Sequence, residues 1–124
     1  MKPHFAAAVT ACLLLAGSAA PAFAAALDCP LPHPEAEPGV IQETPAMIRD
    51  FGDMLSSGTS GNDVGTVLQT LKQRFPKASD GELANFMISA YCPVLNAQGY
   101  DHATATAKLR RFSGLVEDRL FQTQ

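Results

Sequence analysis

Apolar residues recur at helical spacing in four segments between residues 44 and 120, and no alternating run of β-branched residues predicts a strand. The first stripe predicts a helix over 44–55 and consists of Met47, Ile48, Phe51, Met54 and Leu55. The second predicts a helix over 62–75 and consists of Val64, Val67, Leu68, Leu71 and Phe75. The last predicts a helix over 101–120 and consists of Ala105, Leu109, Phe112, Val116 and Leu120.

The third segment, 79–92, is apolar on two sides and is predicted to be the central helix. At about 100° per residue, one of its faces is formed by Leu83, Phe86, Met87, Ala90 and Tyr91. Ile88 and Cys92 fall on the opposite side. A helix that is apolar on two sides is usually covered on both, so this one is expected to lie between other elements.

Residues with capping and breaking tendencies mark where the helices begin and end. The expected N-terminal caps are Thr44, Asn62 or Asp63, Ser79 and Asp101. Ser79 and Glu82 also have the spacing of a capping box, in which each side chain satisfies a backbone N–H of the first turn. Pro93 is expected to end the third helix, with one further kinked turn before Gly99 left open. Gly114 is a candidate for close helix packing.

These elements together predict an all-α fold, a small four-helix bundle that occupies residues 44–124. A core of Leu, Phe, Met and Val without tryptophan is thin for a domain of this size. A covalent cross-link would therefore contribute a large share of the stability.

Residues 1–24 have the features of a secretory signal peptide. Lys2 supplies a positive charge, and the apolar run 5–16 is too short to span a bilayer. Residues 22–24, Ala-Phe-Ala, match a cleavage site, so cleavage is expected near Ala24 and the mature chain is expected to be periplasmic or secreted. A lipoprotein signal ending at Cys12 is the alternative, but the leucines follow this cysteine instead of preceding it.

Residues 25–43 are predicted to form a proline-rich extended strap. Its φ angles are restricted at Pro30, Pro32, Pro34 and Pro38. The strap would be disordered alone, but Cys29 can fasten it, because Cys29 and Cys92 are the two cysteines left after cleavage. An even pair in an exported protein favours a disulfide, and the closed loop of about 64 residues would add roughly 4 kcal/mol of stability.

The charge of the expected mature chain argues against two classes of partner. Removal of Lys2 leaves eight basic and 12 acidic residues, a formal net charge of −4. Nucleic acids and anionic membrane surfaces both favour basic patches, so neither is expected to bind. No segment after residue 25 is apolar enough to predict a membrane span.

A soft-metal site is the alternative use of the cysteines. Its candidate ligands are Cys29, His33, Cys92 and His102. Their spacing matches no paired-ligand motif, and an oxidised pair cannot ligate through thiolate, so the disulfide is favoured and no cofactor is expected. Met47 and Met54 share a helix face, as copper(I) ligands would, but methionines more commonly fill a core.

No catalytic motif is found in the sequence, so the protein is expected not to be an enzyme. The nucleophile motif Gly-x-Ser-x-Gly is missing. Glu35 and Glu37 lie in the strap, which is a poor platform for rigid catalysis. Other carboxylates fall at helix caps and on polar faces, where capping and solubility explain them.

One polar stripe on the third helix has two interpretations; it consists of Glu82, Asn85, Ser89 and Cys92. It suits a ligand groove, or it is the surface on which the strap lies. The second is favoured because Cys92 belongs to the stripe and can tether the strap, with Asn85 and Ser89 bonding the strap backbone. Ile88 would then be covered by Leu27, Leu31 and Ile41.

In outline the chain is similar to the small periplasmic acid-stress chaperones, which are exported, all-helical, of about this size and carry one disulfide. The likeness covers the architecture and no individual residue, and those chaperones tend to be more charged. Size, compartment and the lack of catalytic sets predict a non-enzymatic periplasmic module that binds a protein or peptide. The alternatives are an acid-stress holdase, as the resemblance implies, a metal or small-ligand carrier using Cys, His and Met, and, as a minor one, a catalytic function with no sequence signature.

Overall fold

The computed structural model describes residues 26–56 and 61–122, and within these ranges the chain forms four α-helices and no β-strand. The helices are α1 (Pro45–Ser56), α2 (Gly61–Arg74), α3 (Asp80–Ala97) and α4 (His102–Phe121). The predicted all-α fold is thus confirmed. The expected signal peptide, residues 1–24, lies outside the described residues. Among the helices described, none is long and apolar enough to cross a membrane.

Three of the expected caps are present at the helix N-termini. The Thr44 hydroxyl accepts from the Met47 N–H at 3.2 Å, and the Asp101 carboxylate accepts from the Thr104 N–H at 2.6 Å. Ser79 caps α3 by accepting from the Glu82 N–H at 3.1 Å. The capping box is only half formed, because the Glu82 carboxylate accepts from another part of the chain, as described below. α2 begins at Gly61, one or two residues before the expected caps.

Pro93 does not end the third helix. α3 continues through Pro93 to Ala97, so the further turn that was left open is present, and it stops before Gly99, whose φ of 72° favours glycine. Proline has no N–H, so the carbonyl of Ser89, four residues earlier, lacks its usual helical donor. Cys92 and Leu95 on either side of Pro93 are fully buried, and this burial outweighs the lost hydrogen bond.

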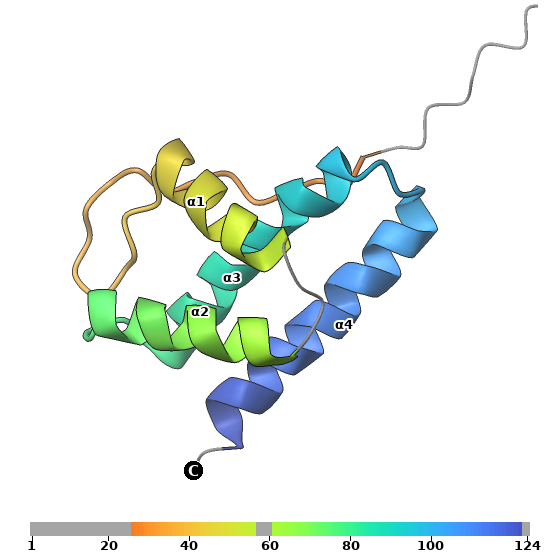
Figure 1. The fold of residues 1–124 in the computed structure, drawn as a ribbon. Coiled ribbons are helices and arrows are strands. Elements are labelled where there is room, and N and C mark those ends of the chain that lie inside the picture. Colours follow the sequence, from red (N-terminus) through yellow and green to blue (C-terminus); the bar gives the residue numbers. More distant parts are fainter. Residues whose placement is uncertain (1–25, 57–60, 123–124) are drawn as a thin grey trace, which may run out of the picture.

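α3 lies at the centre of the arrangement, as Figure 1 shows: α1 and α4 pack on it from two sides, and α2 contacts all three other helices. The predicted apolar face of α3 is buried in these contacts. Leu83, Phe86, Met87 and Ala90 are each no more than 1% exposed. Phe86 meets Phe51 of α1 edge to face at 5.1 Å between ring centroids, and Tyr91 stacks on Phe112 of α4.

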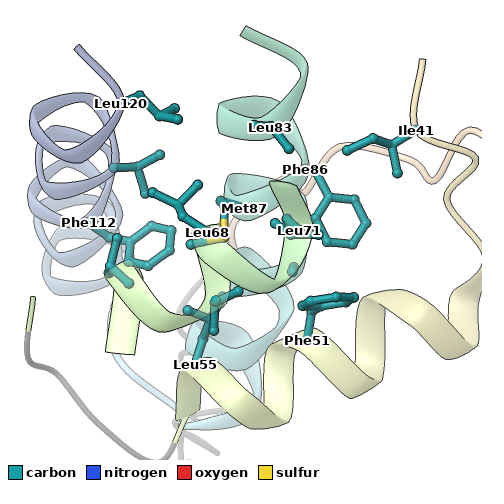
Figure 2. Packing of buried hydrophobic residues seen from close by; sticks show 14 of the residues in the cluster. Ile41, Phe51, Leu55, Leu68, Leu71, Leu83, Phe86, Met87, Phe112 and Leu120 are labelled. Atoms are coloured by element: carbon teal, nitrogen blue, oxygen red, sulfur yellow. The ribbon is translucent and has the colours of Figure 1, made fainter. Parts of the chain in front are cut away.

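The core draws on every helix and on one residue that precedes α1. Ile41 reaches into it on the side of Phe86 and is 1% exposed (Figure 2). Of the predicted apolar stripes, Met54 is the member that the structure leaves exposed, whereas Met47 packs against the core. The methionines therefore do not both fill the core as expected.

A glycine sets how closely α1 and α3 approach. A Cβ atom added at Gly52 would lie 3.0 Å from the Ala90 carbonyl oxygen and 3.2 Å from a Val94 methyl carbon. A glycine here lets the two helices pack with their backbones close together. The expectation for Gly114 was wrong, because nothing lies within 4 Å of a Cβ added there.

Substituting these two glycines should have opposite effects on stability. Gly114→Ala should stabilise the protein by up to about 1 kcal/mol through helix propensity. Gly52→Ala gains the same propensity but forces α1 away from the Ala90 backbone, at a cost of about 1–3 kcal/mol. Urea unfolding of both variants measures the difference. Equal stabilities would mean that the approach at Gly52 is not tight.

Candidate functional site

Residues 26–43, called the N-terminal segment from here on, are fastened to the C-terminal half of α3. Cys29 and Cys92 form a disulfide, as the sequence predicts. One turn further along α3, the Asn96 side chain makes two hydrogen bonds with the backbone of Leu27. Its Oδ1 accepts from the Leu27 N–H at 2.8 Å, and its Nδ2 donates to the Leu27 carbonyl at 2.9 Å. Figure 1 shows the segment, in orange, starting beside this end of α3.

The other end of the segment is tied to the first turn of α3. The Ile41 N–H donates to Glu82 Oε1 at 3.1 Å, and the Ile41 side chain is buried in the core. Between the two ends the segment bonds to itself. The Glu43 N–H donates to the His33 carbonyl at 2.7 Å, and Gln42 Nε2 donates to the Pro34 carbonyl at 2.8 Å. The segment is therefore held at both ends of α3 and closed into a loop before α1.

Several details of the expected contact with α3 are wrong. The side chains that bond the segment backbone are Glu82 and Asn96; Asn85 and Ser89 do not serve in this role in any hydrogen bond of the described residues. Leu31 is 82% exposed and covers nothing. Ile88 lines a hollow between α3 and α4, together with Thr106, Leu109, Arg110, Ser113, Gly114 and Glu117.

A pocket of about 610 Å³ opens between the N-terminal segment and α3. Its lining, which defines what is called the α3 pocket, consists of Pro30, His33, Pro34, Glu35, Glu37, Val40, Glu43, Glu82, Asn85 and Ser89. The polar stripe of α3 forms one wall and the segment forms the other. The segment crosses this side of α3 and leaves a hollow there.

The α3 pocket holds the buried charged residue Glu43, which is only 2% exposed. The His33 N–H donates to Glu43 Oε2 at a long 3.4 Å, and no hydrogen bond of the described residues reaches Oε1. Burial raises the pKa of the Glu43 carboxyl, the His33 N–H and the His33 ring lower it less, and the Glu82 carboxylate raises it again. Among the described residues, neither oxygen of this carboxyl is a fully buried atom without a partner, which is consistent with its place in the wall of an open pocket.

The structure does not assemble the four candidate metal ligands. Cys29 and Cys92 are joined to each other, His33 lines the α3 pocket, and His102 begins α4. Among the described residues, no group of three or more His, Cys, Asp or Glu side chains is placed to hold a metal ion. Met54, one of the thioether candidates, is exposed on α1.

Glu43 was missed in the sequence because it follows the prolines and precedes the Thr44 cap, where a glutamate looks like an exposed linker residue. The signal that could have found it is its position two residues after Ile41. In an extended segment, side chains at i and i+2 face the same way. An apolar anchor at Ile41 therefore brings the Glu43 side chain inward, and both residues are buried.

Comparison with known proteins finds no family model, no curated protein and no solved structure that matches this chain. The function therefore has to be argued from the α3 pocket and the elements that form it.

Removing the disulfide should loosen the wall of the α3 pocket. The bond spans 63 residues of sequence, and its loss from a double variant, Cys29→Ala with Cys92→Ala, should lower the free energy of unfolding by about 4 kcal/mol. Limited proteolysis of the variant should cut within residues 30–40, while circular dichroism keeps much of the helix signal. Asn96→Ala is the control, because it frees Leu27 but leaves the covalent bond. An intermolecular disulfide in the parent protein, or a variant in which proteases make no new cut in the N-terminal segment, would contradict this role of the disulfide.

The stability of the protein should depend on Glu43 in a pH-dependent way. Because the folded state raises the pKa of this carboxyl, its contribution to stability is largest below its ordinary pKa and is lost as the pH rises through the raised value. Glu43→Gln removes the charge, keeps an accepting oxygen and should stabilise the fold at pH 7.5.

The gain in unfolding free energy from Glu43→Gln should shrink toward pH 4, where Glu43 is protonated in the parent protein. Urea unfolding at both pH values measures it, with Asp50→Asn on exposed α1 surface as the matched loss of one charge. A Glu43→Gln protein that is less stable than the parent at pH 7.5 would show that the carboxylate is well satisfied.

Proposed function

We propose that this protein is a non-enzymatic periplasmic module that binds a segment of protein or peptide in the α3 pocket. The observation that carries the proposal is the pocket itself. Its volume of about 610 Å³ falls inside the range of about 300–1,000 Å³ that is typical of ligand sites. It is formed where the chain fastens an irregular segment across a polar stripe instead of filling the space with apolar side chains.

The lining of the α3 pocket suits a peptide. Pro30, Pro34 and Val40 supply apolar surface, and carboxylates with Asn85 supply polar groups. A peptide needs both, because its side chains bury apolar area while its backbone requires hydrogen-bond partners. The backbone of the N-terminal segment bonds largely within the segment, through His33, Pro34, Val40 and Glu43, so the side chains of the lining are the groups left to pair with a peptide.

A binding role is favoured over catalysis by where the ionisable groups lie. His33, Glu35 and Glu37 belong to the N-terminal segment, which has no helix or strand to hold them. Catalytic groups require positions fixed to within about 0.5 Å, which rigid elements supply better than irregular ones. The disulfide and the lack of a membrane-spanning helix among the described residues are compatible with export.

Neither alternative gains a specific observation in its favour. An acid-stress holdase has to loosen as the pH falls. Hydrogen bonds from Thr104 lower the pKa of Asp101, so its cap weakens in acid, but the raised pKa of Glu43 stabilises the fold in the same range. A metal carrier would need ligands other than the oxidised Cys29 and Cys92.

Blocking the α3 pocket from an exposed position should abolish peptide binding. Asn85 lines the pocket and is exposed, so Asn85→Trp fills the space without disturbing the core. Peptides selected on the oxidised protein from a random library should bind the parent and Gln69→Trp, an exposed amide on α2, but not Asn85→Trp. Calorimetry measures the affinities. Peptides that bind all three proteins alike, or a library that yields none, would refute the proposal.

A further inference from the structure

Building on the proposed function, we infer that the α3 pocket takes a basic side chain of the bound peptide, the ammonium group of a lysine or the guanidinium group of an arginine, on the Glu43 carboxylate. Four glutamates line the pocket, namely Glu35, Glu37, Glu43 and Glu82, and His33 is the one basic residue of its lining. A cavity with an excess of one sign of charge concentrates ligands of the opposite sign.

Surface charge alone would not identify a ligand, but Glu43 is not on the surface. Its side chain is 98% buried and forms part of the cavity wall. Within the described residues its Oε1 receives no hydrogen bond, and its Oε2 receives one long bond of 3.4 Å from the His33 backbone. A buried carboxylate in this state gains most from a charged donor that enters the cavity beside it.

The donors of a basic side chain match the groups of this lining. Ammonium and guanidinium groups carry three and five N–H donors and no acceptor. They complement a wall to which four glutamates contribute carboxylate groups.

The apolar part of the lining fits the stem of such a side chain. Pro30, Pro34 and Val40 lie in the segment wall, opposite the polar stripe of α3. Lysine and arginine bury their methylene stems against apolar surface and keep the charged end on polar groups. No three acidic or other ligating side chains of the described residues are grouped for a metal ion, so the arrangement favours an organic cation.

The inference is tested with blocked tripeptides on the oxidised protein, followed by amide NMR shifts. The probes are acetyl-Ala-Lys-Ala-amide and its arginine, norleucine and glutamate counterparts. The lysine and arginine peptides should give saturable shifts at Glu43, Glu82 and Ser89, and binding should weaken as salt is added. Norleucine, which has the stem without the charge, should bind at least about tenfold more weakly.

Glu43→Gln should weaken binding of the lysine peptide by about tenfold or more, whereas Asp50→Asn, which removes the same charge from exposed α1 surface, should leave it unchanged. Glu35→Gln, at an exposed position of the lining, is the second variant and should weaken binding by a smaller factor. Equal binding of norleucine and lysine, or equal losses in Glu43→Gln and Asp50→Asn, would overturn the inference.

The two proposals can fail separately. One outcome is that the selected library peptides need an open α3 pocket but lack basic residues, and bind Glu43→Gln as tightly as the parent. This outcome would support peptide binding and refute the cation site at Glu43. Conversely, saturable binding of the lysine tripeptide with no peptide selected from the library would support the cation site and refute a pocket that recognises a longer peptide segment.

Discussion

The link between Cys29 and Cys92 is the constraint on which the rest of the site depends. The N-terminal segment has four prolines and few apolar residues, and of its large apolar side chains Ile41 is the one that is fully buried. Such a segment buries too little surface to offset the entropy of ordering it. The covalent bond removes much of that entropy from the unfolded chain. Asn96 and Glu82 then need only to set its position.

At Glu82, a long-range hydrogen bond replaces the local capping bond that the sequence predicts. Its spacing from Ser79 predicts a carboxylate that returns to its own helix end. In the structure that carboxylate accepts a hydrogen bond from the Ile41 N–H, 41 residues away. The N-terminal cap of α3 is then formed by the Ser79 side chain alone. An exposed capping bond is worth little, whereas leaving the N–H beside a buried isoleucine without an acceptor would be costly.

The helices could be predicted from the sequence because their signals are local: apolar spacing, caps at Thr44, Ser79 and Asp101, and glycine at the end of α3. The disulfide followed from there being two cysteines in the expected mature chain. A groove along the polar stripe of α3 was one of two interpretations, but the opposite wall of the pocket could not be predicted, since it depends on where Ile41 enters the core. Pro93 was misjudged because propensity describes an isolated helix, and burial of Cys92 and Leu95 overrides it.

The contacts that build the α3 pocket join residues 41 to 69 positions apart, whereas each helix forms from neighbours. In the oxidised chain the disulfide already holds residue 29 beside residue 92, so these contacts close with little further loss of loop entropy. A ligand held there adds its binding free energy to the folded state alone, because the pocket exists only when both of its walls are in place.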